Sequence, residues 1–272
     1  MSELDVFSGH YDALLCDLSE EWDIEFQDLN DQSYDLNMDD QKIAIHNFGL
    51  SEDRLLTSPY FRPQILLAIA ESLRMARHVE WLDGVFNRYH PETILLMGRI
   101  CVADTMVHKI DYAWQMKKQG DDSLWKYTLC SDIADMAQSY IRVLETCFTN
   151  ELSRKKAMET ALNMWFSCES RIQNCDHDTL NMVDDMIAEG EMFDNQSLQA
   201  NAVTCLTLMN GQNTTYLSRH LVQDILKTPY YRGVNDVINQ THLMQTIADM
   251  NKFHVNGLVF HDADLASRFT VH

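Results

Sequence analysis

The sequence predicts an all-α protein, a single multi-helix globular domain with an acidic N-terminal arm. Only 9 Gly and 4 Pro occur among 272 residues, which is few for a chain with many tight turns between strands. Apolar residues recur at helical spacing through most of the chain, and 46% of all residues are hydrophobic, enough for a substantial core. No Pro-, Gly- or Ser-rich linker divides the sequence, which favours one helical body over two separable domains.

The acidic arm is predicted to span residues 1–50 and to be partly helical. Residues 1–40 contain thirteen Asp and Glu and neither Lys nor Arg. Such a run is typical of a solvated surface, and a docking or mimicry role is the alternative. The spacing of apolar residues predicts helices at residues 11–22 and 39–48, with a short extended piece at residues 24–26.

The helical body is predicted to span residues 51–272, with two long helices at residues 63–82 and 91–117 in its centre. Pro63 and Pro91 each suit the first turn of a helix, where no backbone N–H is needed. Each helix carries an apolar stripe that we expect to face the core. The predicted stripe residues are Leu66, Ile69, Leu73, Ala76 and Val79 in the first helix and Leu96, Ile100, Ala103, Val107, Ile110 and Trp114 in the second.

The same periodicity predicts further helices after this pair. Their ranges are residues 131–146, 151–169, 176–188, 198–209, 216–227 and 234–251. Residues 255–272 are predicted to form a hairpin-like or irregular tail.

The net charge of −20 and the pI near 4.7 restrict the partners of this protein. A surface of this sign repels the phosphates of nucleic acid and the anionic headgroups of a membrane, so we expect neither as a partner. A basic protein or peptide is the partner that the charge favours.

The cysteines and the hydropathy predict a cytoplasmic location. The seven cysteines are an odd number without a C-x-x-C pair, which is typical of reduced, buried thiols. We expect no signal peptide, because the N-terminus has neither a positive region nor an apolar core. We expect no membrane span either, because no run of about eighteen apolar residues occurs.

Polar residues at helical spacing form the candidate site of the two central helices. If the helices pack antiparallel, as the short turn between them favours, their polar faces meet. The candidate metal ligands are Glu71, His78, Asp104, His108 and Asp111. Carboxylates and imidazoles that converge from neighbouring helices can bind zinc or another divalent metal. The alternative is a hydrogen-bonded network that pairs Glu71 with Arg74 and His108 with Asp104.

Several segments resemble an uncharacterised bacterial family described as putative zinc metallopeptidases. Residues 66–78 are similar to its A-H-E-L-R-H-A-x-Q helix, and residues 99–104 resemble its R-x-x-E-A-D-A segment. Residues 112–117 are similar to its A-Y-E-L-K helix end. Residues 161–166, followed by Asp176, resemble its A-F-x-A-W-F…Y-D segment.

The departures from the family pattern concern the catalytic motif itself. Aligned on its helix, the first zinc-binding His falls on Glu71, the catalytic Glu on Ser72 and the second His on Met75. The downstream acidic ligand falls on Val102, close to Asp104. H-E-x-x-H binds zinc through two imidazoles one turn apart while its Glu activates water. The resemblance therefore implies that this chain is a family member that lacks peptidase activity of the kind that H-E-x-x-H supports.

The lead hypothesis is a catalytically inactive relative of metallopeptidases that acts as a binding or scaffold protein and holds no cofactor. One alternative is a metal-dependent hydrolase whose rearranged site uses Glu71, His78, Asp104 and His108. The other is an acidic inhibitor or effector-type protein that uses residues 1–40 against a basic partner.

Overall fold

The computed structural model describes residues 22–30, 32–146, 151–191, 193–194, 196–209 and 212–250, together with the backbone of residues 253–255 and 258–260. The described chain is mostly helical, which confirms that part of the predicted fold class. The helix predicted at residues 11–22 lies, except for its last residue, outside the described residues, and the acidic arm stays a prediction. Within the described ranges, no helix is both long and apolar enough to cross a membrane.

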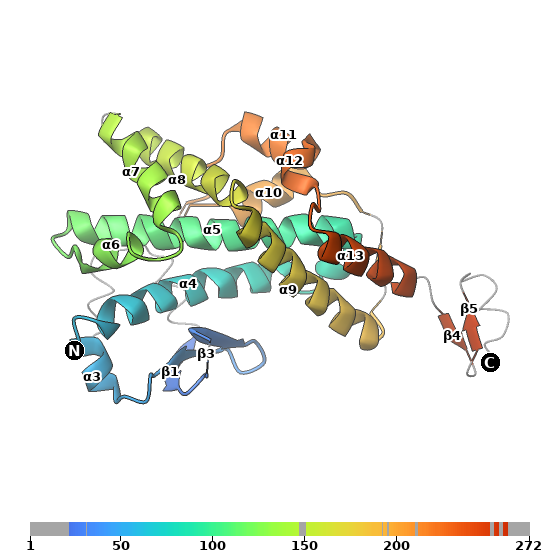
Figure 1. Ribbon diagram of the computed structural model, residues 1–272, viewed down its shortest axis with the longest axis horizontal. Helices are drawn as coiled ribbons and strands as arrows, with labels where there is room; N and C mark the ends of the chain where they lie inside the picture. The colour runs from blue at the N-terminus through green and yellow to red at the C-terminus, as the bar shows by residue number, and fades with distance from the viewer. Residues whose placement is uncertain are drawn as a thin grey trace.

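The central helices are α4 (Phe61–Leu82) and α5 (Pro91–Lys118). Figure 1 shows α5 running through the middle of the molecule, with α4 along one side and α7, α8 and α9 packed elsewhere around it. The remaining helices, in chain order, are α3 (Glu52–Thr57), the 3-10 helix η1 (Phe86–Arg88), α6 (Ser123–Thr128), α7 (Ala134–Thr146), α8 (Glu151–Phe166), α9 (Glu169–Ala188), α10 (Ala200–Leu206), α11 (Arg219–Lys227), α12 (Pro229–Arg232) and α13 (Val237–Met250).

A small three-stranded sheet covers the side of α4 that faces away from α5 (Figure 1). Its strands are β1 (Asp23–Gln27), β2 (Tyr34–Asn37) and β3 (Lys42–His46). β3 lies in the middle, parallel to β1 and antiparallel to β2. The extended piece predicted at residues 24–26 is thereby confirmed as part of β1.

The helix predicted at residues 39–48 is wrong, because Lys42–His46 is the central strand. Ile43 and Ile45 are two residues apart, so they point to the same face of a strand but to different faces of a helix. Both side chains are 0% exposed in the core against α4. β-branched residues at this spacing favour a strand. Gln41, directly before the strand, has a left-handed backbone conformation with φ 51°, which interrupts any right-handed helix there.

The predicted pair of long helices is confirmed. α5 begins at Pro91, and the His90 side chain accepts a hydrogen bond from the backbone N–H of Glu92. α4 begins at Phe61, slightly before Pro63. The predicted stripe residues are buried, apart from Val79 and Trp114, which are partly buried.

The later helices agree with their predicted positions but not with all of their bounds. α9 begins at Glu169, well before residue 176, and the extended backbone of Cys168 precedes it. The short helices α6 and α12 were not predicted. β4 (Phe253–Val255) and β5 (Leu258–Phe260) pair antiparallel, in agreement with a hairpin-like tail, and the rest of that tail lies outside the described residues.

A glycine allows the close crossing of α5 and α9. Gly98 on α5 faces Thr179 on α9, and a Cβ atom at Gly98 would lie 2.6 Å from the Thr179 Oγ1. A side chain at this position would have to displace the Thr179 side chain, so the absence of a Cβ atom at Gly98 allows this close approach.

Candidate functional site

The polar faces of α4 and α5 meet because the two helices pack antiparallel. Arg74 and His78 on α4 reach Asp104 on α5, while Glu71, one turn earlier on α4, reaches Lys109, one turn later on α5. This order of partners is the one that antiparallel packing requires. It separates the predicted ligands into an Asp104 cluster and an outlying Glu71.

Asp104 is the centre of the Asp104 cluster, which consists of Arg74, His78, Asp104, His108 and Tyr216. Its Oδ2 accepts a hydrogen bond from the Arg74 Nε at 2.6 Å and lies 2.9 Å from the His78 Nε2. Its Oδ1 accepts from the Tyr216 hydroxyl at 2.9 Å. Burial is the largest single effect on this carboxyl and opposes its ionisation. The Arg74 guanidinium, together with His108 and the hydrogen bond from His78, outweighs burial and lowers the pKa of Asp104 below its usual range.

Arg74 also anchors the end of α10 to this cluster. Its Nη2 donates to the backbone carbonyls of Leu206 at 3.2 Å and Leu208 at 2.9 Å. The side chain of Arg74 is only 3% exposed. The guanidinium thus fills the space beside Asp104 and joins three segments of the chain.

His108 lies at the edge of the cluster without a described hydrogen bond. Its Nε2 is 3.6 Å from the Asp104 Oδ1, too far for a good hydrogen bond. Within the described residues, neither of its buried ring nitrogens has a hydrogen-bond partner. Burial, with the nearby charge of Arg74, lowers the pKa of His108 to about 3, so the imidazole is neutral at neutral pH.

Asp111 belongs to a separate ion pair. Arg154 on α8 donates to it from Nε at 2.9 Å and from Nη2 at 2.5 Å, and the Tyr140 hydroxyl on α7 donates at 2.6 Å. Burial opposes the ionised form, but the charge of Arg154 and these hydrogen bonds lower the pKa of Asp111. The carboxylate therefore ties α5 to α7 and α8.

A second buried ion pair, between Arg99 and Asp176, connects α5 to α9. The Arg99 Nε and Nη2 each donate to one oxygen of Asp176 at 2.6 Å. The Arg99 Nη1 donates to the carbonyl of Tyr231 at 2.6 Å, and Nη2 also donates to that of Gly233 at 3.1 Å. The pair thereby reaches the segment around α12.

The geometry fits a polar packing network better than a metal centre. Among the described residues, no group of three or more His, Cys, Asp and Glu side chains is arranged to hold a metal ion. Arg74 and Arg154 already place cationic groups against Asp104 and Asp111, and Glu71 is paired with Lys109. The metal-binding role of the five predicted ligands stays a prediction.

The sequence hypothesis of a network predicted the kind of interaction and one of its two pairs, since His108 lies 3.6 Å from Asp104. Arg74 pairs with Asp104 instead of Glu71. Tyr216, Tyr140 and Arg154 were missed, since each comes from a segment distant in the chain. No local spacing signals such partners.

A comparison with family models identifies the chain. The model described as "Putative metallopeptidase family (DUF6782)" matches residues 77–213, half of the chain. The chain belongs to this family. The matched range of the putative metallopeptidase family contains His78, Asp104 and His108 and excludes Glu71 and Ser72, which lie before it. Searches of curated proteins and of solved structures found no match.

Proposed function

We propose that this member of the putative metallopeptidase family is a binding or scaffold protein without peptidase activity. The observation that carries the proposal is the guanidinium of Arg74, 2.6 Å from the Asp104 carboxylate in the interior. A metal ion at Asp104 would have to displace this cation and break its bonds to two backbone carbonyls.

The burial of the cluster supports the same conclusion. Asp104 is 0% exposed, His78 2% and His108 3%. A peptidase has to bring water and a peptide carbonyl to its catalytic groups. Ser72, where the family resemblance expects the catalytic Glu, is buried and donates its hydroxyl to the carbonyl of Ile69.

A basic protein or peptide is the partner that we propose. The net charge of −20 would attract such a partner over a distance comparable to the Debye length. We further propose a cytoplasmic location, supported by the free thiols of Cys101, Cys130, Cys168, Cys175 and Cys205.

Metal analysis combined with a hydrolysis assay tests the loss of activity. We expect purified full-length protein to contain no stoichiometric zinc, iron or manganese and to leave fluorogenic peptides uncleaved, with or without added zinc. One equivalent of bound metal together with chelator-sensitive cleavage would overturn the proposal.

A fluorescent oligolysine tests the proposed basic partner. We expect it to bind and its binding to weaken steeply as salt is added, whereas salt-independent binding would reject this partner class.

A metal-dependent hydrolase with a rearranged site is the second candidate function. The observation that favours it is His108, whose two buried ring nitrogens have no partner in the described part of the chain. An unprotonated imidazole nitrogen is a good metal ligand. Under this alternative His108→Ala removes a metal that the natural protein binds, whereas under the first proposal neither protein binds one.

A further inference from the structure

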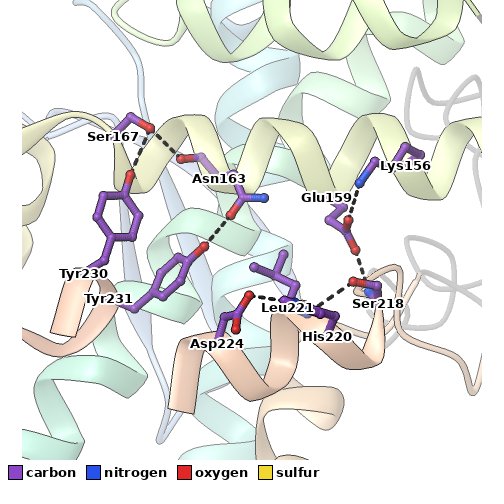
Figure 2. A pocket seen from close by; sticks show the side chains of 10 residues that line it. All are labelled: Lys156, Glu159, Asn163, Ser167, Ser218, His220, Leu221, Asp224, Tyr230 and Tyr231. Carbon is purple, nitrogen blue, oxygen red and sulfur yellow. Dashed lines mark hydrogen bonds and ion pairs between the residues drawn. The ribbon is translucent and has the colours of Figure 1, made fainter. Parts of the chain in front are cut away.

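A polar pocket of about 520 Å³ lies outside the Asp104 cluster, between α8 on one side and α11 and α12 on the other (Figure 2). Its volume is within the usual range for small-molecule sites, about 300–1,000 Å³. Such sites are mostly apolar, whereas here Leu221 is the sole aliphatic side chain among the lining residues that the structure describes. The lining residues are Lys156, Glu159, Asn163, Ser167, Ser218, His220, Leu221, Asp224, Tyr230 and Tyr231.

Hydrogen bonds between the elements hold the walls of the pocket in place. Glu159 on α8 accepts a hydrogen bond from the backbone N–H of Ser218, the N-cap residue of α11, at 2.5 Å. Tyr231 on α12 is fixed at both ends, since its hydroxyl donates to the Asn163 Oδ1 at 2.8 Å and its carbonyl accepts from Arg99. A ligand would therefore meet a preformed site and lose little of its binding energy to ordering the protein.

The carboxylates of the pocket each have a nitrogen neighbour within its described walls. Lys156 lies 2.6 Å from Glu159 and pairs with its charge, and the His220 Nδ1 lies 2.7 Å from the Asp224 Oδ2. An anionic ligand would meet the carboxylates of Glu159 and Asp224, and a cationic one would meet the ammonium of Lys156. The pocket therefore favours a ligand without net charge.

Hydrogen-bonding groups of both kinds remain available to such a ligand. The Ser167 hydroxyl donates to the carbonyl of Asn163, so the hydrogen between Ser167 and Tyr230, 3.0 Å apart, comes from Tyr230. Both tyrosine hydroxyls thus use their hydrogens inside the wall and retain lone pairs as acceptors. The Asn163 Nδ2 has no hydrogen-bond partner among the described residues, and Figure 2 shows this amide beside the opening between α8 and α11.

We propose that this pocket binds a neutral saccharide. A sugar hydroxyl donates and accepts at once, which matches the Asn163 amide donor beside the phenol and carboxylate acceptors. The ring of Tyr230, 50% exposed, offers an apolar face for the C–H groups of a sugar ring. A peptide is the poorer fit, because peptide grooves add pockets for apolar side chains and this one has only Leu221.

Titration calorimetry of the full chain with maltotriose, cellotriose and diacetylchitobiose tests the proposal. We expect saturable binding of at least one of them. Asn163→Asp removes the amide donor but keeps the Oδ1 acceptor for Tyr231, and Tyr230→Ala removes the exposed ring. Each variant should weaken binding about tenfold or more, about 1.4 kcal/mol. Asn181→Asp makes the same charge change at an exposed position of α9 and should leave binding unchanged.

The proposal fails if none of the saccharides binds at millimolar concentration, or if both variants bind as the natural protein does. Saturable binding of an uncharged acetylated pentapeptide in place of the sugars would also overturn it. Circular dichroism establishes that each variant is folded, and Tyr230→Ala at an exposed site keeps the test available if Asn163→Asp unfolds. No lining residue belongs to the Asp104 cluster, so these outcomes are independent of the metal and peptidase assays.

Discussion

Arg99 and Asp176 form a buried bidentate ion pair, with both N–O distances at 2.6 Å. Both residues lie in segments that resemble the putative metallopeptidase family, one at the start of residues 99–104 and the other after residues 161–166. Their structural role is to join α5 to α9 and, through the carbonyl of Tyr231, to α12. The similarity of this chain to the family at these two positions is therefore explained by their role in the fold and does not by itself indicate catalysis.

Arg99→Met should destabilise the protein by about 3–5 kcal/mol, because it leaves the Asp176 carboxylate buried without a counter-ion. Urea unfolding followed by circular dichroism measures the loss. Arg99→Met combined with Asp176→Leu should recover most of it, since no buried charge remains. A double variant as unstable as the sum of both single variants would contradict this account.

His108→Leu should leave the free energy of unfolding unchanged or raise it by about 1 kcal/mol, because it removes polar atoms that are buried without partners. His78→Leu is the matched control, and it should destabilise, since Asp104 loses the hydrogen bond from the His78 Nε2. The urea midpoints of the two variants, compared with that of the natural protein, show whether each substitution stabilises or destabilises the fold. Equal destabilisation would mean that His108 holds a partner such as a water or an ion.

Stability should fall as the pH is lowered from about 6.5 toward 3. The pKa of His108 is about 3 in the folded protein against 6.5 for the free side chain. Between these values the unfolded state binds a proton that the folded state does not, so acid favours unfolding. The pKa of buried His78 is lowered as well.

In His108→Leu the slope of stability against pH in this window should decrease by up to about 1.4 kcal/mol per pH unit. Urea titrations at several pH values measure it. The lowered pKa of Asp104 acts in the same direction but only in more strongly acid solution, below its unfolded pKa of 3.8. A slope that His108→Leu leaves unchanged would show that His108 is not the titrating group.

Gly98→Ala should destabilise by about 1–3 kcal/mol, because its Cβ would lie 2.6 Å from the Thr179 Oγ1. In a Thr179→Ala background the same change should instead stabilise, since the clash is gone and Ala favours the helix by about 1 kcal/mol. Thermal unfolding of the four proteins in this cycle measures both effects. The same sign in both backgrounds would refute the close approach of α5 and α9.

The long helices could be predicted from the sequence because their signals are local. Pro91 marks the start of α5, and the apolar stripe along it repeats over many turns. The strand β3 was mistaken for a helix because five residues are too few to establish a period. Only the packing of Ile43 and Ile45 against α4 decides between the two conformations.

The candidate site could be predicted only to the level of the two helices. Antiparallel packing brings His78 to Asp104, as the spacing on α4 and α5 indicated. Other groups of the candidate site come from segments distant in the sequence. Tyr216, for example, donates a hydrogen bond to Asp104 although the two residues are 112 positions apart. Arg74 pairs with Asp104 in preference to Glu71, and this choice between two carboxylates depends on tertiary geometry, which local spacing does not encode.

The position of β3 between β1 and β2 has a practical consequence for studies of the acidic arm. Removal of the first forty residues would delete both neighbours of β3 and leave two open strand edges, which promote aggregation. A truncated protein would then lose partner binding for reasons unrelated to charge. The contribution of the acidic residues is better measured by charge-neutralising substitutions at exposed positions such as Asp35 and Asp39, which keep the sheet intact.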